Sequence, residues 1–209
     1  MSAIKESSDE LNPTVSTSAT ASPKEKGRRT LVDYLALAIA TCGVGYFPIA
    51  PGTLGALVGV GLYLTIWGSL YRLLETNALR GHLDMRYIFT PLMAAMLLLI
   101  VLVTIAGTWA ATRAENVMQR KDPSAVVIDE VAGQMIALLS GPFWLPWWSI
   151  LTAFILFRLF DIWKPYPIRR FEALESGLGI MADDLLAGIY ALIVNSLLVA
   201  GYLLISPRA

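Results

Sequence analysis

The sequence is poor in the residues that build most disulfide and metal sites. Its 209 residues include one cysteine and one histidine. A single cysteine excludes a disulfide framework within the chain, and a single histidine excludes a multi-histidine metal site. Charge is also scarce, because charged residues make up 15% of the chain, whereas a soluble domain carries about 25%. These shortages exclude a disulfide-rich secreted domain and an ordinary water-soluble surface.

The charges that are present balance in sign, with 16 Lys and Arg against 16 Asp and Glu. There is no basic excess of the kind that attracts nucleic acid, so we expect no nucleic-acid partner. Hydrophobic residues make up 56% of the chain, and the mean hydropathy is +0.61. The composition therefore indicates a protein that has the bilayer as its solvent.

Residues 1–30 differ in composition from the rest of the chain. They hold five basic and four acidic residues among Ser, Thr, Pro and Ala, with almost no large apolar side chain. Such a segment buries too little surface to offset its ordering entropy, so we predict a disordered tail, followed by one helical membrane domain over residues 31–209. The basic residues at the end of the tail favour a cytoplasmic N-terminus.

Four long runs without charge follow the tail. They are Tyr34–Tyr71, Tyr87–Thr112, Val131–Phe157 and Leu185–Pro207. A helix needs about 20 residues to cross the hydrocarbon layer, so each run is long enough. No strand-like alternation of useful length occurs, and we therefore predict an all-α fold, a membrane-associated helical bundle.

The third run contains breaks. Gly141-Pro142 and Pro146 predict two shorter helices joined by a turn. Trp144, Trp147 and Trp148 lie at this turn. Indole rings favour the membrane–water boundary, but packing in an aromatic core explains them equally well, and the sequence leaves both interpretations open.

Acidic side chains stand inside or against the apolar segments, where ionisable groups are costly and mark candidate functional sites. The residues concerned are Asp129, Glu130, Asp161, Asp183 and Asp184. The pattern Asp-x-x-Ala-Gly occurs twice, at 129–133 and at 184–188. Residues at i, i+3 and i+4 share a helix face, so each acid stands above a small-residue pair that allows a second helix to approach closely. Packing of the two helices through these faces would bring their acids together.

Each acidic pair also has a simpler explanation, because acids in the first turn of a helix cap free N–H groups and complement the helix dipole. Capping accounts for one carboxylate per helix, but not for two adjacent ones with the same small-residue pattern. Clustered carboxylates repel one another unless a cation lies among them, and hard oxygen ligands suit Mg²⁺. We therefore expect Mg²⁺ as the cofactor.

A basic cluster follows the acid at Asp161. Arg158 lies three residues before Asp161, which is the spacing of an ion pair within one helix. Lys164 and Pro165 end the predicted helix, and Lys164, Arg169 and Arg170 form a cationic group suited to phosphate. Contact of these cations with anionic lipid headgroups is the competing interpretation.

The loop over residues 43–55 is rich in glycine and proline. Thr53 has the character of a helix N-cap, and Gly52 would let the backbone approach a ligand. A helix N-terminus after such a loop is a ready anion site, although a tight connection to a capped helix explains the loop as well.

Four ordered blocks resemble the phosphatidylglycerophosphatase A family over roughly residues 35–200. They are Phe-Pro-Ile-Ala-Pro-Gly-Thr-Leu-Gly (47–55), Val-Ile-Asp-Glu-Val-Ala-Gly (127–133), Phe-Arg-Leu-Phe-Asp-Ile-Trp-Lys-Pro-Tyr-Pro-Ile (157–168) and Gly-Ile-Met-Ala-Asp-Asp-Leu-Leu-Ala-Gly (179–188). The resemblance implies an all-α fold and Mg²⁺-dependent removal of the terminal phosphate of phosphatidylglycerophosphate, a step of phospholipid biosynthesis. Relatives often carry Gly-Ser after the Thr, whereas this chain has Gly55-Ala56.

The residues themselves agree with this chemistry by exclusion. Cys42 is followed six positions later by Pro48 instead of the Arg of a cysteine phosphatase, His82 stands alone, and no Asp-x-Asp occurs. Metal-assisted attack of water remains. The resulting hypothesis assigns metal binding to Asp129, Glu130, Asp183 and Asp184. It assigns catalysis to Asp161 (as a further ligand or the water-orienting base), Lys164 and Arg158, and substrate binding to Gly52, Thr53, Lys164 and Arg169.

Two other classes of protein are alternatives. A phosphatidyl-transfer enzyme would also use metal and acids in a membrane bundle, but its expected Asp-Gly-x-x-Ala-Arg motif is missing from this sequence. A transporter or other ion-coupled bundle would scatter buried acids through the membrane, whereas these acids lie at predicted helix ends. The resemblance favours the enzyme, with the lipid and the membrane as its partners. It further implies the inner membrane of a bacterium, with the active site facing the cytoplasm.

Overall fold

The structure is a computed structural model that describes residues 29–81, 86–140, 146–171, 174 and 176–205. Within these ranges every regular element is a helix, as the sequence predicts. The helices are α1 (Leu31–Thr41), α2 (Pro51–Gly81), α3 (Arg86–Met118), α4 (Ile128–Ala137), α5 (Trp148–Trp163), α6 (Ile168–Phe171) and α7 (Ser176–Ile205). Of the tail expected over residues 1–30, all but the last two residues lie outside the described part of the chain.

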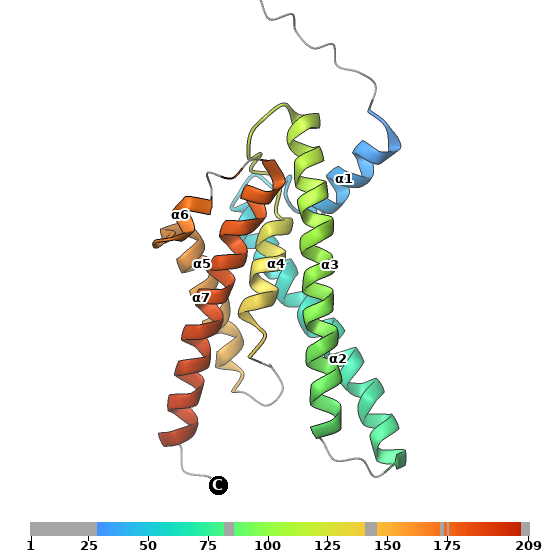
Figure 1. Cartoon of the computed structure of the whole chain (residues 1–209), viewed down its shortest axis with the longest axis vertical. Coiled ribbons are helices and arrows are strands. Elements are labelled where there is room, and N and C mark those ends of the chain that lie inside the picture. Colours follow the sequence, from blue (N-terminus) through green and yellow to red (C-terminus); the bar gives the residue numbers. More distant parts are fainter. Residues whose placement is uncertain (1–28, 82–85, 141–145, 172–173, 175, 206–209) are drawn as a thin grey trace, which may run out of the picture.

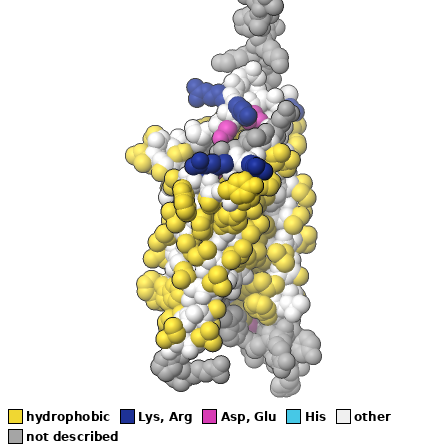
Figure 2. Space-filling model, turned by 60° about the vertical axis from the view of Figure 1, so that its left-hand side comes forward, with side chains coloured by type: hydrophobic (Ala, Val, Ile, Leu, Met, Phe, Trp, Pro, Cys, Tyr) yellow, Lys and Arg dark blue, Asp and Glu magenta, His cyan; other side chains and the backbone are white. Residues whose placement is uncertain are grey.

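Among the described residues, three helices are long and apolar enough to cross a bilayer: α2 over Pro51–Thr76, α3 over Phe89–Met118 and α7 over Ser176–Ile205. Their outward faces carry large exposed apolar side chains, among them Leu98 and Ile105 of α3 and Leu197 of α7. Figure 2 shows that apolar side chains cover most of the height of the molecule, with Lys and Arg gathered near one end. Such a continuous apolar surface is suited to contact with lipid.

The break predicted in the third apolar run is present. Helix α4 ends at Ala137 and α5 begins at Trp148, and both are too short to cross the membrane alone. Gly141, Pro142 and Trp144 lie outside the described residues. Trp147 is exposed, whereas the Trp148 ring packs edge-on against Tyr202 of α7, with 5.4 Å between the ring centroids.

Helix α1 is short because its ends are set by local signals. Thr30 and Asp33 form a capping box: the Thr30 hydroxyl accepts from the Asp33 amide, and the Thr30 amide donates to the Asp33 carboxylate at 2.7 Å. At the other end Cys42 adopts a left-handed conformation with φ 48°, which stops the helix. The Gly/Pro loop then leads to Pro51, a residue favoured in the first turn of a helix.

The helices alternate in direction, and this alternation gathers the functional segments at one end (Figure 1). The first residues of α2, α4 and α7 and the last residues of α3 and α5 all lie at the end of the molecule that also carries α1. The changes of direction thus bring together four sequence blocks that are far apart in the chain. They also place the acids and cations beyond most of the apolar surface.

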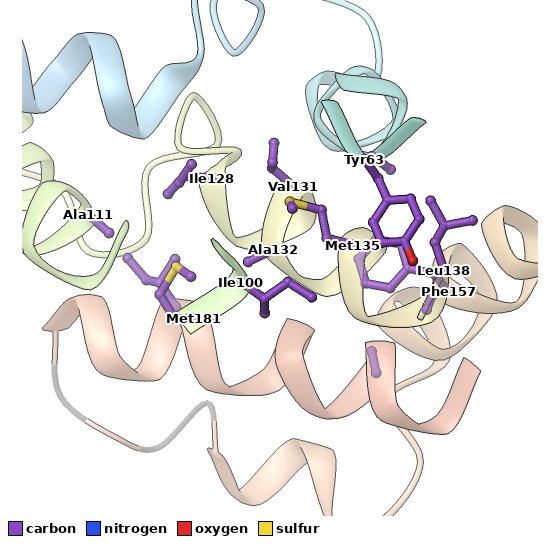
Figure 3. Close-up of a cluster of buried hydrophobic side chains, with 14 of the residues drawn as sticks. Tyr63, Ile100, Ala111, Ile128, Val131, Ala132, Met135, Leu138, Phe157 and Met181 are labelled. Atoms are coloured by element: carbon purple, nitrogen blue, oxygen red, sulfur yellow. The ribbon is translucent and has the colours of Figure 1, made fainter. Parts of the chain in front are cut away.

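The core is built around α4, which lies between α2, α3, α5 and α7. Eight of its ten residues are buried. Figure 3 shows its apolar side chains meeting those of neighbouring helices, such as Tyr63 of α2, Phe157 of α5 and Met181 of α7. Burial of this short helix on all sides fixes the position of the two acids at its start.

Two predicted helix starts are wrong. Helix α2 begins at Pro51, so Thr53 is the third helical residue and not the N-cap. Helix α7 begins at Ser176, so Asp183 and Asp184 lie two turns inside it and not at its opening. The earlier start of α7 is possible because Gly177 approaches the backbone of Thr108 in α3 closely. First-turn capping therefore cannot explain this acidic pair.

Candidate active site

The site is assembled by the contact between α4 and α7. Gly133 of α4 faces Asp184 of α7, where an added β-carbon would lie 2.5 Å from the Asp184 carbonyl oxygen. A β-carbon at Gly188 would likewise collide with the backbone of Gly133. The two helices therefore touch backbone to backbone through the Ala-Gly pairs, as the repeated Asp-x-x-Ala-Gly pattern predicts. Asp129 and Asp184 lie one turn above the glycines on these faces.

Three carboxylates meet at this contact. One oxygen from each of Asp129, Glu130 and Asp184 lies within 4.8 Å of the other two. Asp129 and Asp184 are buried, and Glu130 is half-buried. Asp129 Oδ1, Glu130 Oε2 and Asp184 Oδ2 are each buried without a hydrogen-bond partner among the described residues. Buried polar atoms are nearly always satisfied, so three orphaned oxygens in one place indicate that the site receives a further group.

The pKa values of Asp129 and Glu130 on α4 also indicate that the site receives a further, positively charged group. Burial raises the pKa of Asp129 well above its ordinary value, and the neighbouring charges of Glu130 and Asp184 raise it further. Burial also raises the pKa of Glu130, although a hydrogen bond with Asp129 and the charge of Arg158 act in the opposite direction. Ionisation of the whole cluster is unfavourable without a compensating positive charge.

A cavity of about 330 Å³ opens beside the cluster. Besides the three acids it is lined by Arg158, Asp161 and Lys164 from the end of α5 and by Asp183 from α7. Both cations are held by carboxylates. Arg158 Nη1 lies 2.5 Å from Asp161 Oδ2, which confirms the ion pair suggested by their spacing. Lys164 Nζ lies 2.6 Å from Asp183 Oδ2.

Lys164 owes its position to the end of α5. It adopts a left-handed conformation with φ 47°, and its amide closes the last turn by donating to the Phe160 carbonyl at 2.8 Å. The helix thus ends at Trp163, where the Lys-Pro pair predicts its end. Since the chain turns away here, the Lys164 side chain reaches across to α7 and joins Asp183.

The start of α2 forms another wall of the cavity. A β-carbon at Gly52 would collide with Glu130 Oε1 and would lie 3.1 Å from a guanidinium nitrogen of Arg158. A side chain here would displace the ends of the Glu130 and Arg158 side chains, so the backbone at the start of α2 lies directly against the acid and the cation. A helix N-terminus leaves its first N–H groups without intrahelical partners, and these groups favour anions.

The structure thus brings together most of the predicted site residues. The residues that line the cavity include Gly52, Asp129, Glu130, Arg158, Asp161, Lys164, Asp183 and Asp184. Thr53 and Arg169 are not among its lining residues, and Arg169 is exposed on α6. Asp183 belongs to the ion pair with Lys164 and lies outside the group of three acids.

Sequence reasoning missed two polar residues of the cavity wall, Asp122 and Ser124. Both lie in the connection between α3 and α4, where no helical periodicity relates them to the acids. Asp122 has φ 46°, and its amide donates to the Glu115 carboxylate at 2.9 Å. The signal in the sequence that could have indicated Asp122 is its position as an acid in a turn, shortly before the Val-Ile-Asp-Glu block.

These residues suit a metal ion. The donors are carboxylate oxygens, they come from two helices whose contact is fixed by glycines, and three of the oxygens lack any other partner among the described residues. A divalent cation would satisfy those oxygens and remove the repulsion between the acids. The arrangement can therefore hold a cation beside Arg158 and Lys164, which together can bind and neutralise a phosphate group.

Comparison with known proteins gives a consistent result. A family model described as phosphatidylglycerophosphatase A matches residues 37–199. A Haemophilus influenzae protein named phosphatidylglycerophosphatase A is 41% identical over 153 residues, covering 73% of this chain and 80% of the relative. An Escherichia coli protein of the same name is 30% identical over 149 residues, covering 70% of this chain and 73% of the relative.

A third relative carries a different name. A Bacteroides thetaiotaomicron protein, provisionally named a phosphatidylinositol-3-phosphatase, is 43% identical over 153 residues, covering 73% of this chain and 85% of the relative. No solved structure shows a significant match. The matched residues include every part of the cavity wall described above, and all three names denote lipid phosphatases. The chain therefore belongs to the phosphatidylglycerophosphatase A family and is a lipid phosphatase.

Proposed function

We propose that the protein hydrolyses the terminal phosphomonoester of phosphatidylglycerophosphate to phosphatidylglycerol and inorganic phosphate, as a step of phospholipid biosynthesis. One observation carries this proposal: the three partnerless carboxylate oxygens share a cavity with two cations, Arg158 and Lys164. The family match and the names of the relatives from H. influenzae and E. coli support the choice of lipid.

We further propose Mg²⁺ as the metal, held by Asp129, Glu130 and Asp184. The donor atoms of this site are carboxylate oxygens, and Mg²⁺ prefers oxygen ligands. When bound, Mg²⁺ would polarise the phosphate and lower the pKa of a water molecule beside it. Asp183 contributes to phosphate binding indirectly in this arrangement, since its carboxylate pairs with Lys164.

The remaining residues have roles that follow from their positions. Arg158 and Lys164 bind the phosphate oxygens and neutralise the charge that develops on them, and their carboxylate partners hold them in place beforehand. Asp161 lies close enough to Glu130 to interact with its charge, and it either joins the ligands or orients the attacking water. The N–H groups of Gly52 and Thr53 at the start of α2 offer further hydrogen bonds to the phosphate.

Arg169 remains a proposed contact to the lipid from outside the cavity. It is exposed on α6, five residues beyond Lys164. A headgroup that enters the cavity leaves its phosphodiester nearer the surface, where an exposed guanidinium can reach it. Arg170, whose guanidinium lies 4.9 Å from the centre of the Tyr166 ring, is held against that aromatic face.

The substrate also fits the placement of the site in the molecule. The acids and cations lie at one end of the apolar surface (Figure 2), where the headgroup of a lipid lies while its acyl chains stay in hydrocarbon. The basic residues before α1 favour the cytoplasmic side for that same end. We therefore propose the inner membrane of a bacterium, with the active site facing the cytoplasm.

A second substrate follows from the name of the B. thetaiotaomicron relative. Phosphatidylinositol 3-phosphate also carries a phosphomonoester on a lipid headgroup, and the carboxylates, Arg158 and Lys164 would act on it in the same way. The two lipids differ in the bulk between the phosphomonoester and the diacylglycerol, so one enzyme preparation can be compared on both.

The test is phosphate release from each lipid by the purified full-length protein in detergent micelles, with Mg²⁺ and after chelation by EDTA. We expect release from phosphatidylglycerophosphate that requires the metal and exceeds release from phosphatidylinositol 3-phosphate. A reversed preference would assign the second substrate. Absence of release from both lipids under Mg²⁺, Mn²⁺ and Ca²⁺ would overturn the proposed function.

A further inference from the structure

A second depression in the surface lies outside the active site. It is a groove of about 670 Å³ along α3, closed on one side by Leu178 of α7, and it shares no lining residue with the active-site cavity. Its walls carry exposed apolar side chains: Ile105 is 63% exposed, Trp109 42% and Leu178 55%. Because α3 is among the described helices that are long and apolar enough to cross a bilayer, we infer that this groove faces the bilayer.

The floor of the groove is made by a row of threonines, Thr104, Thr108 and Thr112. Each hydroxyl donates to the carbonyl four residues earlier at 2.8 Å. Their protons are therefore already used within the helix, and the groove presents methyl groups and satisfied oxygens. Such a floor does not require a polar ligand and accepts a hydrocarbon chain.

A cation stands at the headgroup end of the groove. Arg113 lines it near the end of α3, and its side chain is 43% exposed. Its Nε donates to Asp33 Oδ1 at 2.7 Å. No other hydrogen bond or ion pair of this guanidinium occurs among the described residues, so its two terminal nitrogens retain their donors. A guanidinium fork of this kind binds phosphate oxygens in a bidentate manner.

Arg113 and the charged residues beside it at the start of α1, Arg29 and Asp33, carry a net charge of +1. Asp33 of α1 is its partner, and Thr30, which caps α1, holds the same carboxylate. Arg29 directly precedes Thr30 and is exposed, so a further basic residue lies next to the cap of α1. The nearby acid of α3, Glu115, lines a different cavity and accepts a hydrogen bond from the Asp122 amide. Two cations against one carboxylate favour an anionic ligand.

We propose that this groove is a binding site for an anionic phospholipid, separate from the active site. The phosphodiester binds the terminal nitrogens of Arg113, and one acyl chain lies along the threonine row beside Trp109. From Arg113 the groove extends along the helix to Thr104, which is roughly 14 Å at about 1.5 Å per residue. This length accommodates most of an acyl chain.

Trp109 provides a direct readout. The full-length protein is reconstituted in phosphatidylcholine nanodiscs that contain a small fraction of lipid brominated on its acyl chains, either phosphatidylglycerol or phosphatidylcholine. The chain has six tryptophans, so a parallel Trp109→Phe variant isolates the signal of Trp109. We expect bromine on phosphatidylglycerol to quench Trp109 with an apparent affinity about fivefold above that of brominated phosphatidylcholine, because one basic residue near the headgroups contributes about that much.

Two matched variants separate the cation from the ion pair. Arg113→Gln removes the charge and should abolish the preference for phosphatidylglycerol. Asp33→Asn breaks the same ion pair but keeps Arg113, so the preference should persist or increase. Equal quenching by both lipids in the wild type would overturn the proposal, and so would an unchanged preference in Arg113→Gln. Loss of preference in both variants would also overturn it, since the contact between α1 and α3 would then be responsible.

Discussion

Gly133 of α4 packs against the backbone of Asp184 in α7 so closely that a β-carbon at Gly133 would lie 2.5 Å from the Asp184 carbonyl oxygen. Non-bonded carbon and oxygen atoms do not approach this closely, so alanine at this position requires a shift of one helix. The same holds for Gly188 against Gly133. Since each helix carries an acid one turn away, the separation of the carboxylates depends on these glycines.

The first prediction concerns this contact. We expect Gly133→Ala and Gly188→Ala each to lower kcat by about 10²-fold, because a misplacement of about 1 Å can have that effect. Gly61→Ala is the matched control: Gly61 is also helical, but an added β-carbon there meets no atom within 4 Å. Phosphate release by the three variants, compared at equal folded fractions by circular dichroism, checks the prediction. Equal activity of all three would show that the acids do not depend on close helix packing.

This contact was predictable from the sequence because helical periodicity and small residues are both local properties. Asp184, Ala187 and Gly188 share a face whatever the surrounding fold, and so do Asp129 and Gly133. The helical period also separates Asp184 from Asp183, because neighbouring residues are rotated by about 100° around the helix axis. Asp183 therefore meets Lys164 instead of the other acids. The sequence hypothesis placed both acids on the metal, although only Asp184 belongs to the repeated pattern.

The parts that could not be predicted depend on tertiary contacts. Helix α7 begins at Ser176, which has φ 60°, and Gly177 then packs against the Thr108 carbonyl of α3. Neither the positive φ nor the partner helix is visible in the sequence. Asp122 and Ser124 reach the cavity through an irregular connection, for which residue spacing gives no face and no direction.

The second prediction tests the metal ligands. Asp129→Asn and Asp184→Asn keep the size of the side chain but remove a negative charge from the cluster. We expect both to lower kcat by roughly 10³-fold, because charge at a metal-assisted centre contributes several kcal/mol. Binding of Mg²⁺, measured by isothermal titration calorimetry without substrate, should weaken in parallel.

Asp122→Asn is the control for this prediction. Asp122 lines the same cavity but is exposed and outside the group of three acids. Asparagine also tolerates its positive φ. We expect this variant to bind Mg²⁺ as the wild type does. Normal Mg²⁺ binding by Asp129→Asn would show that Asp129 acts as a helix cap and not as a ligand.

The third prediction concerns pH and the attachment of α1. Hydrogen bonds from the Thr30 backbone and hydroxyl, together with Arg113, lower the pKa of Asp33 to about 2. The pKa of Asp in an unfolded chain is about 3.9, so the folded state binds its proton less readily. The stabilisation is fully present above about pH 4 and is lost as the pH falls toward 2. Thermal unfolding in detergent at several pH values should show Asp33→Asn less stable than the wild type at pH 6, with the difference vanishing near pH 2. A difference that stays constant between pH 6 and pH 2 would contradict this linkage.

The last prediction compares Asp183 with Asp184, which are neighbours in the sequence but face different partners. Asp183 Oδ2 accepts a hydrogen bond from Lys164 at 2.6 Å, whereas Asp184 Oδ2 is buried without a partner among the described residues. Asp183→Asn should therefore release Lys164 and weaken substrate binding, and we expect KM to rise about tenfold with kcat within a factor of about three, as for loss of uniform binding. Its affinity for Mg²⁺ should stay close to that of the wild type.

Asp184→Asn should show the opposite division, with kcat and Mg²⁺ affinity lowered together. Lys164→Met tests whether Asp183 acts through Lys164, because it removes the other partner of their ion pair. If Asp183 acts only through Lys164, the double variant Asp183→Asn/Lys164→Met should be no worse than Lys164→Met alone, which a double-mutant cycle measures. If Asp183 is itself a metal ligand, Asp183→Asn will lower Mg²⁺ affinity as much as Asp184→Asn does, and the effects of Asp183 and Lys164 will add.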